Sequence, residues 1–581
     1  MRRFIFPAVV ISLTLLFFWK LAFTDLILAR GDTYYFFYPL WAARDQAFRA
    51  GELPLWTNNV FMGAPLLSDP QPGTLYPPNW LTMMLAPPDA IRISILLHVA
   101  WATAGAMLLA RRVLRLDVLP ALIAGAIFGL GGYLGSHVEQ INQLQGLAWL
   151  PWALLVFALA LDRPGRYTPL LAVIFALQVL SGHTQTVFIT GVGLGLYGLV
   201  DTIQHRAQRA APLLRRFLKF GVILIGAVLL AAILAIAQLY PTLELTGLSN
   251  RGGGFNPQQA MAFSWNPFLA GRGLLPGYDA QVFGEYVAYV GVVGLALALY
   301  GILAGDNRKW RWLILIVIGI FFAFGLYNPL YWTLAGLPGF NLFRVPARWL
   351  VLFAIGAAML AGLGAQTLMQ TRSRWRDLIV ISGVIGMIAA STLLADRAAN
   401  EVDGAAVPGI LTWGLWGAAL VLFIGFMRWR SSLVVKLLPV IVIGELFLAS
   451  LTMPYNDLAA PEAYHDARMS IHQLQAYCDD KSLCDRVLSI SGGFFDPGDK
   501  AAMTTRYANL TERANRHAFT AAKMKELVAP NLPLVWDVPS VDGAGGGIIP
   551  TSYYTQFTSL MLPEGLPRSI DGRLREFLAL P

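Results

Sequence analysis

Long apolar runs alternate with short polar connections through the first 453 residues of the chain. A helix needs about 20 mostly apolar residues to cross a bilayer. Runs of about that length lie at 5–27, 92–110, 118–135, 146–161, 168–182, 186–203, 220–239, 286–304, 312–328, 347–369, 378–395, 409–427 and 433–453. The pattern predicts an all-α polytopic membrane domain over 1–453 with about thirteen transmembrane helices. The runs at 146–161 and 168–182 are short enough to be broken or re-entrant.

Basic residues mark one side of this predicted domain. Alternate connections carry Arg2 and Arg3; Arg111, Arg112 and Arg115; Arg163 and Arg166; Arg206, Arg209, Arg215, Arg216 and Lys219; Arg308, Lys309 and Arg311; Arg372, Arg374 and Arg376; Arg428 and Arg430. Lys and Arg are retained on the cytoplasmic side of membrane proteins. We therefore expect a cytoplasmic N-terminus and, after an odd number of spans, an extracytoplasmic C-terminal region.

Composition agrees with a membrane protein and argues against nucleic-acid binding. Of 581 residues, 56% are hydrophobic and only 13% are charged, whereas soluble domains carry about 25% charged residues. The formal net charge of +9 comes from the short clusters between apolar runs. No basic stripe with interleaved aromatic residues is present, so we expect no nucleic-acid partner.

Residues 454–581 differ from the rest because they are polar, with only short apolar stretches and a Gly-rich run at 543–547. We expect a small α+β extracytoplasmic domain, or part of one. Cys478 and Cys484 are the only cysteines and stand six positions apart. A disulfide is one interpretation in an oxidising compartment, and two free thiols is the other. Two cysteines do not supply the four ligands of a structural zinc site.

The first outer loop, 28–91, is too polar and too rich in Pro, Gly and Asn to cross a bilayer. Asp32 opens it, followed directly by the aromatic residues of 34–37. A carboxylate in such a low-dielectric setting has raised basicity and can accept a proton. Alternatively, Asp32 is the N-cap of a helix that starts at Thr33.

The segment from Tyr34 to Arg49 has the pattern of an amphipathic helix lying in the membrane interface. Its expected apolar side is Tyr34, Phe37, Leu40, Trp41 and Phe48, and its expected water-facing side is Arg44, Asp45 and Arg49. Asp69, farther along the loop, lies between Pro and Gly residues. It is either a second acid near Asp32 or a turn residue.

Other outer connections carry further candidate groups. His137 and Glu139 follow the third predicted helix, and His183 lies in a tight turn between the fifth and sixth. These residue types can bind a metal or position a hydroxyl, or they can cap helix ends. Arg344 and Arg348 are spaced i,i+4, which on a helix would point them the same way. They are either ligands for a phosphate or an interfacial anchor pair.

Several separated stretches together resemble the bacterial YfhO-like membrane proteins. They are GDTYYFFYPL, GELPLWTNNVFMGAPLLSDPQPGTLYPPNWL, LPGFNLFRVPARWLVLF and VDGAGGGIIPTSYY. That family is similar to GT-C glycosyltransferases, polytopic enzymes with an acid in the first outer loop and a polyprenyl-phosphate sugar donor. The resemblance implies a GT-C-like architecture, a place in the bacterial cell membrane and a role for Asp32 as the base. The single acid of GDT departs from the paired acids of some GT-C enzymes, and the C-terminal region is shorter than the resemblance implies.

The resulting hypothesis is a glycosyltransferase acting on the outer face. It would move a sugar from a polyprenyl-phosphate donor to an envelope glycopolymer or lipid acceptor, as in lipoteichoic acid glycosylation. Asp32 would be catalytic. The expected substrate-binding residues are Arg344, Arg348, His137, Glu139, His183, Asp69 and Tyr34. We expect membrane lipids as further partners and no cofactor or metal, because no HxxxH or HExxH spacing is present. The alternatives are a lipid or polysaccharide transporter or flippase, and a non-catalytic envelope scaffold.

Overall fold

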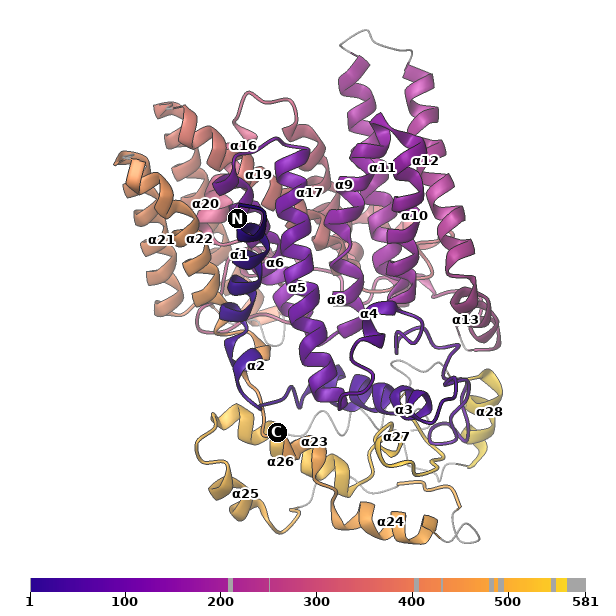
Figure 1. Ribbon diagram of the computed structural model, residues 1–581. Helices are drawn as coiled ribbons and strands as arrows, with labels where there is room; N and C mark the ends of the chain where they lie inside the picture. The colour runs from indigo at the N-terminus through magenta and orange to yellow at the C-terminus, as the bar shows by residue number, and fades with distance from the viewer. Residues whose placement is uncertain are drawn as a thin grey trace.

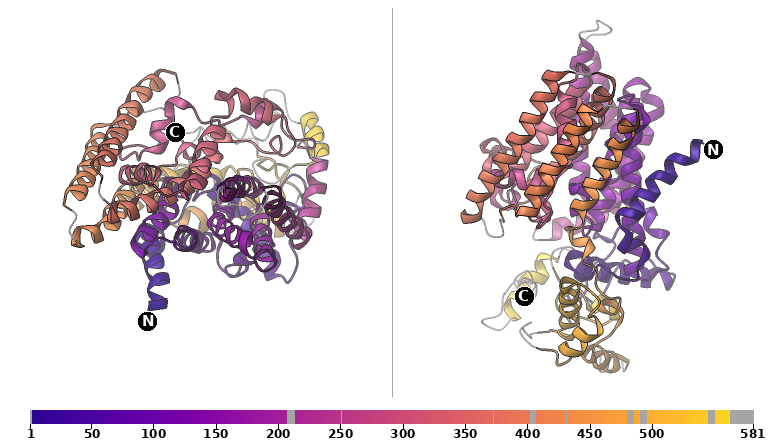
Figure 2. Two further views of the ribbon diagram at one scale, coloured as in Figure 1. Left: turned by 90° about the horizontal axis from the view of Figure 1, so that it is seen from above. Right: turned by 90° about the vertical axis from the view of Figure 1, so that its left-hand side faces the viewer.

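The computed structural model describes residues 2–206, 213–249, 251–371, 373–401, 407–429, 432–479, 485–489, 496–544 and 550–561. Its described part is mostly helical, with long helices standing side by side and shorter C-terminal helices packed under one end of them (Figure 1). Seen from two further directions, α1 lies at the side of the long helices with its first residues leaning away from them (Figure 2). The main core is therefore a helix bundle with an added polar part at one end.

The predicted apolar runs all contain helices. In chain order these are α1 (Arg2–Phe17), α2 (Trp19–Phe23), α5 (Pro87–Arg112), α6 (Val118–Leu130), α7 (Gly132–Ser136), α8 (Ile141–Leu147), α9 (Leu150–Asp162), α10 (Pro164–Leu180), α11 (Thr184–Arg206), α12 (Leu213–Leu234), α13 (Ile236–Leu248), α16 (Val292–Ile302), α17 (Lys309–Ala323), α19 (Leu350–Gln370), α20 (Arg374–Glu401), α21 (Ile410–Arg428) and α22 (Ser432–Ser450). The innermost helix is α19, most of whose residues are fully buried.

Within the described residues, eight helices are long and apolar enough to cross a membrane, so the predicted count of thirteen is not confirmed. Three more apolar helices are shorter, at Phe6–Phe17, Pro164–Leu180 and Val292–Ile302. The last illustrates why the count differs. The run at 286–304 stays non-helical until Gly291, whose φ of 84° is a left-handed conformation that favours glycine, and the helix begins only at Val292.

Connections predicted to be cytoplasmic meet at one end of the bundle. Arg308, at the start of α17, donates to the carbonyl of Leu114 after α5. Gln204, near the end of α11, donates to the carbonyl of Asn307 and accepts at 3.0 Å from Arg311. In Figure 1, α11 and α12 extend to the end farthest from the C-terminal helices. The connections after α5, after α11 and before α17 therefore lie at one end of the bundle.

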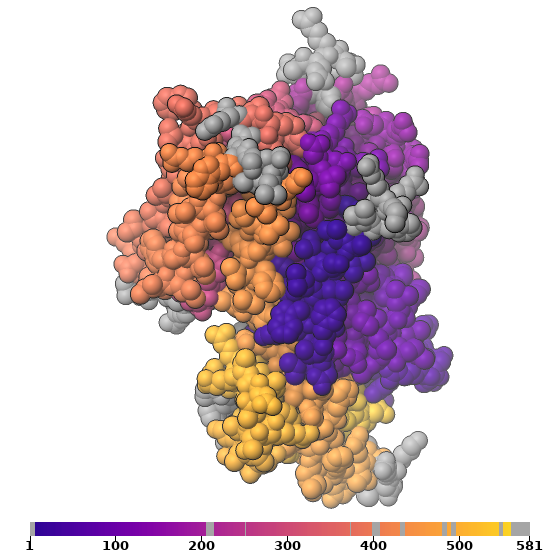
Figure 3. All heavy atoms as spheres, turned by 60° about the vertical axis from the view of Figure 1, so that its left-hand side comes forward, coloured from indigo at the N-terminus to yellow at the C-terminus, as the bar shows by residue number. Residues whose placement is uncertain are grey.

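The first outer loop and the C-terminal helices meet at the opposite end. The loop contains η1 (Thr33–Phe37), a π-helical turn, followed by α3 (Tyr38–Arg49) and α4 (Pro77–Trp80). The C-terminal helices are α23 (Glu462–His465), α24 (Met469–Asp479), α25 (Lys500–Arg506), α26 (Glu512–Glu526), α27 (Pro533–Trp536) and α28 (Ser552–Met561). Figure 3 shows this C-terminal part beneath the spanning helices, next to the N-terminal segment.

Backbone contacts fasten these two parts together. Ile27 and Ala459 form an antiparallel bridge, and the amide of Phe61 donates to the carbonyl of Asp542 at 3.3 Å. Such bridges are isolated, and the described residues contain no β-strand, so an α+β C-terminal region is not confirmed. Cys478 is disulfide-bonded, whereas Cys484 lies outside the described residues.

The predicted water-facing side of α3 is wrong for two of its three residues. Arg44 and Asp45 are each only 1% exposed. The Arg44 guanidinium stacks 4.2 Å from the centre of the Trp41 ring, pairs with Asp45 at 2.7 Å and donates to the carbonyl of Pro72 at 2.7 Å. The loop after α3 folds back over the helix, so a side that periodicity assigns to water is covered by chain.

Candidate functional site

Asp32 lies between α2 and η1, at the end of the bundle that carries the C-terminal helices. Its backbone is already helical, and its side chain makes no capping hydrogen bond, so the N-cap alternative is wrong. Instead, the Tyr35 hydroxyl donates to Asp32 Oδ1 at 2.6 Å. Burial raises the pKa of Asp32 above the ordinary value of 3.8, against the lowering effect of that hydrogen bond. The carboxylate is therefore a stronger base than a solvated one.

Glu139 lies next to this carboxylate. The Thr33 hydroxyl donates to the Glu139 carbonyl at 3.0 Å, and Arg30 Nε lies 2.8 Å from Glu139 Oε1. Gly31 has a φ of 49°, which favours glycine, and a Cβ there would lie 2.8 Å from Glu139 Oε2. Burial raises the pKa of Glu139 to about 7, with Arg30 lowering it and Asp32 raising it.

Arg348 and Glu285 form a buried ion pair beside these acids. Glu285 lies in η3 (Gly284–Tyr286), is 5% exposed and is 2.7 Å from Arg348 Nη2. His137 Nε2 lies 3.1 Å from the other Glu285 oxygen, and the Tyr133 hydroxyl donates to the Arg348 carbonyl at 2.9 Å. Burial alone would raise the pKa of Glu285, but Arg348 and His137 hold it below its ordinary value. Glu285 is therefore a fixed anion.

His183 completes the surroundings of Arg348. Nη1 of Arg348 donates to His183 Nε2 at 3.1 Å and to Gln185 Oε1 at 2.9 Å. Burial and the Arg348 charge hold the pKa of His183 well below its usual range, so the ring is neutral. Because Nε2 accepts, Nδ1 carries the proton and donates to the Thr186 hydroxyl at 2.6 Å.

Arg344 and Arg348 do not share a helix face, so the expected i,i+4 arrangement is wrong. Val345 between them has a φ of 65°, and the 3-10 turn η5 (Pro346–Trp349) begins only after it. Arg344 is therefore exposed, whereas Arg348 is partly buried. Both charges nevertheless lower the pKa of Asp32, so both lie within electrostatic reach of its carboxylate.

The side chains of Asp69 and Tyr34 make other contacts. Asp69 is fully buried, and its Oδ1 accepts from the amide of Gln71 at 3.0 Å, as in an Asx turn. Burial raises its pKa to about 7, while the Gln71 amide and Arg251 lower it. The Tyr34 hydroxyl donates to the carbonyls of Ala463 and Ala521, at 2.9 and 3.3 Å. Tyr34 therefore fastens the first loop to the C-terminal helices.

The model of the family described as "Bacterial membrane protein YfhO" matches residues 75–487, well over half of the chain. The chain belongs to the YfhO family. The matched range contains His137, Glu139, His183, Glu285 and Arg348, and Asp32 precedes it. This YfhO-family chain is thus a membrane protein, as the resemblance implies.

Two solved structures illustrate what this YfhO-family chain is similar to. ArnT from Cupriavidus metallidurans, bound to undecaprenyl phosphate, is 12% identical with a TM-score of 0.45, covering 89% of this chain and 84% of its own. Arabinofuranosyltransferase AftD from Mycobacteria is 16% identical with a TM-score of 0.42, covering 68% of this chain and 26% of its own. No curated protein matches the chain.

Sequence reasoning missed three residues that shape the site of this YfhO-family chain. They are Tyr35, which holds Asp32; Glu285, which holds Arg348; and Arg30, which pairs with Glu139. Glu285 stands directly before the apolar run at 286–304, a position that could have marked it. No group of three or more His, Cys, Asp or Glu able to hold a metal occurs in the part of the chain that the structure describes.

Proposed function

We propose that this YfhO-family protein is a GT-C-type glycosyltransferase that moves a sugar from a polyprenyl-phosphate donor to a cell-envelope acceptor. The observation that carries the proposal is the neighbourhood of Asp32. A carboxylate with a raised pKa lies within electrostatic reach of Arg344, Arg348 and Glu285, which come from distant segments. Membership of a bacterial membrane protein family supports a lipid-linked donor, because such a donor is delivered within the bilayer.

The chemistry assigned to Asp32 is general-base catalysis. One of its oxygens is held by Tyr35, which leaves Oδ2 to accept a proton from the acceptor hydroxyl. As that hydroxyl oxygen bonds to the anomeric carbon, the bond from this carbon to the phosphate oxygen breaks. The polyprenyl phosphate leaves with the electron pair, and the proton remains on Asp32. Attack on the face opposite the leaving group inverts the anomeric configuration.

The leaving phosphate needs a cation. The contacts of the two arginines suggest that they have different roles. Arg348 already donates to Glu285, His183 and Gln185, so we assign it the positioning of these groups near Asp32. Arg344 is exposed and still influences Asp32, which suits a residue that meets the donor phosphate. Glu139, His137 and His183 are assigned to the walls that orient sugar or acceptor.

The proposed topology places this chemistry on the outer face. We propose that α1, α10, α16, α17 and α22 cross the membrane together with the eight longer candidates, which gives thirteen crossings. The basic end is then cytoplasmic with the N-terminus, and residues 454–581 form an extracytoplasmic domain. The transmembrane domain over 1–453 has a GT-C-like architecture in this proposal, in a bacterial cell membrane.

A transporter or flippase needs ionisable groups inside the bilayer that serve a pathway. The buried Glu445 in α22 is such a group by position, but its oxygens accept from the amides of Val292 and Val293. This carboxylate therefore caps the N-terminus of α16. Its role in helix capping favours the transferase over the transporter.

The test is transfer of radiolabelled sugar from a polyprenyl-phosphate donor in membranes with and without the protein. Asp32→Asn should reduce transfer at least 100-fold, because removal of a general base costs about 10²–10⁴. The matched control is Asp25→Asn, an exposed acid in the same segment, which should keep wild-type transfer. Full transfer by Asp32→Asn would contradict the assignment of Asp32 as the general base. No transfer above background by the wild type would favour the scaffold alternative.

A further inference from the structure

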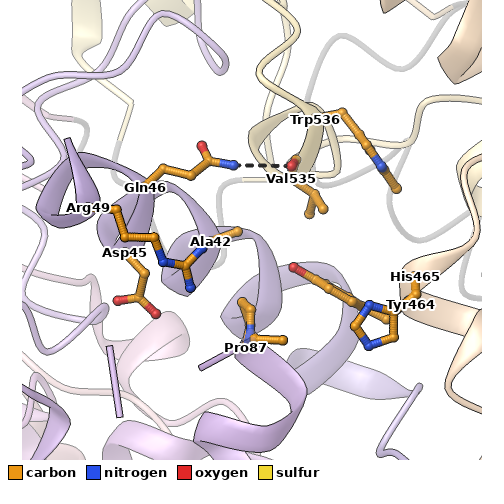
Figure 4. Close-up of a pocket in the computed structure, with 10 residues that line it drawn as sticks. Ala42, Asp45, Gln46, Arg49, Pro87, Tyr464, His465, Val535 and Trp536 are labelled. Carbon is orange, nitrogen blue, oxygen red and sulfur yellow. Dashed lines mark hydrogen bonds between the residues drawn. The ribbon is translucent and has the colours of Figure 1, made fainter. Parts of the chain in front are cut away.

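A cavity of about 260 Å³ lies between α3 and the C-terminal helices (Figure 4). It is distinct from the surroundings of Asp32, and none of the site residues above lines it. Its walls are Ala42, Asp45, Gln46, Arg49, Ala86, Pro87, Tyr464, His465, Val535 and Trp536. Small-molecule pockets begin at about 300 Å³, so this cavity suits a group the size of one or two rings.

The two walls of the cavity differ in chemistry. Figure 4 shows polar side chains from α3 on one side and aromatic side chains from the C-terminal helices on the other. Gln46 bridges them by donating to the carbonyl of Val535 at 3.3 Å. Sugar rings combine apolar C–H faces, which pack on aromatic rings, with hydroxyls that need both donors and acceptors. The cavity offers both features.

Two groups on its walls have hydrogen-bonding capacity to spare. Asp45 is 1% exposed, and although Oδ1 accepts from Arg44, Oδ2 has no partner among the described residues. A buried acceptor left unpaired costs about 1–3 kcal/mol. In the described part of the chain, no hydrogen bond engages the Tyr464 hydroxyl, which points toward the cavity (Figure 4).

The charges favour a neutral ligand over an anionic one. The Asp45 carboxylate on the wall is paired with the Arg44 guanidinium at 2.7 Å, so this ion pair offers an anion no net positive charge. The Arg49 guanidinium is turned to the start of α5, where Nη2 donates to the carbonyl of Leu85 at 2.8 Å. Hydroxyl groups of a neutral pyranose match the Tyr464 phenol and the Gln46 amide on the walls.

We propose that this cavity binds a neutral pyranose unit of the acceptor, at a distance from the hydroxyl that reacts. The inference rests on the proposed function and names the acceptor as a saccharide. Asp45 follows Asp32 by 13 positions through η1 and α3, a rise of about 20 Å along a helix. The bound unit is thus several sugars away from the reacting one, and α3 sets the distance between them. Remote binding of this kind orients the acceptor.

The test uses the full-length purified protein on an array of three probes: neutral pyranose oligosaccharides, uronate-containing oligosaccharides and glycerol-phosphate oligomers. The wild type should retain neutral oligosaccharides. Ala86→Trp fills the cavity and should weaken that binding at least tenfold, whereas Ala50→Trp, at the exposed end of α3 and outside the cavity, should not. Tyr464→Phe removes one hydroxyl but no hydrogen bond within the described residues, and should weaken binding about three- to tenfold.

Three outcomes would overturn the inference: retention of glycerol-phosphate or uronate probes alone, equal retention by Ala86→Trp and wild type, or no retention of any probe. Tyr464→Phe guards against misfolding of the larger variant, because it keeps the ring in place. Asp32→Asn should bind neutral oligosaccharides as the wild type does while losing transfer. If the wild type binds through the cavity but transfers no sugar, the proposed transferase activity is contradicted and the cavity assignment stands. Normal transfer with cavity-independent binding would remove only the cavity assignment.

Discussion

The two ends of the bundle use the same residue types in different ways. At the basic end, Arg308 pairs with Asp306 two residues earlier, and both side chains are partly exposed, at 36% and 24%. Lys309 donates to the carbonyls of Ile302, the last residue of α16, and of Ala304 just after it. At the other end, Arg348 pairs with Glu285, which is 63 residues away and only 5% exposed.

The difference shows what separates an anchor from a site. Local, hydrated pairs such as Asp306–Arg308 neutralise charge and cap helix ends, and each contributes little to stability. Buried pairs between distant segments fix a geometry, and they raise or lower the pKa of neighbouring acids such as Asp32 and Glu139. Burial and sequence separation, rather than residue type, distinguish the two ends.

The largest effect is expected when one acid of an ion pair is neutralised at each end of the bundle and the two losses of stability are compared. Glu285→Gln leaves the partly buried Arg348 without its anion, so it should destabilise the protein by about 3–5 kcal/mol and reduce transfer. Asp306→Asn should cost under about 1 kcal/mol and leave transfer unchanged. The measurement is thermal unfolding in detergent beside the transfer assay. Equal losses at the two ends would show that burial does not separate them.

A second test asks whether a buried acid outside the cluster is structural. The raised pKa of Asp69, about 7, means that the folded state binds its proton more tightly than the unfolded chain does. The contribution of Asp69 to stability is complete below about pH 4 and is lost as the pH rises to about 7. Asp69→Asn should therefore be more stable than wild type by about 1–3 kcal/mol at pH 8 and similar at pH 4.

The measurement for Asp69→Asn is the unfolding midpoint across that pH range, and transfer should stay at the wild-type level. Lost transfer with unchanged stability would instead return Asp69 to the substrate-binding residues. That result would extend the site beyond the cluster around Asp32 and weaken the contrast drawn between a structural acid and a catalytic one.

The smallest effect concerns the tuning of Asp32 itself. A base must be deprotonated, so kcat/KM should fall as pH is lowered, with an inflection above 3.8. Tyr35→Phe removes a hydrogen bond that lowers the Asp32 pKa, and should move the inflection upward by about one pH unit. Tyr553→Phe, an exposed tyrosine on α28, is the control. An unmoved inflection in Tyr35→Phe would mean that another group titrates.

Much of the bundle follows from the sequence, because each apolar run long enough to span contains helix, although several runs are broken or start late. Asp32, Glu139 and the two histidines could also be placed at one end, since helix alternation alone decides which connections meet. The position of Glu285 directly before an apolar run could have marked it, but its pairing with Arg348 could not be predicted, because nothing local records a contact formed across 63 residues.

Two further predictions are wrong, those for Arg44 and for the pair Arg344 and Arg348. Their causes cannot be predicted from hydrophobic periodicity. The burial of Arg44 depends on the loop that folds back over α3 to bring Pro72 into contact. The separation of Arg344 from Arg348 depends on the left-handed backbone of Val345, a conformation that is uncommon for a β-branched residue. Side-chain spacing predicts a shared face only where the helix is continuous.

The bridge between Ile27 and Ala459, with the Tyr34 hydroxyl bound to Ala463 and Ala521, sets an order of events during biosynthesis. The first outer loop leaves the ribosome early, but the residues that hold it are translated more than four hundred positions later. Because domains form from the N-terminus onward, the loop waits for its cover until translation is nearly finished. Prematurely terminated chains would therefore leave the first outer loop without the contacts that hold it.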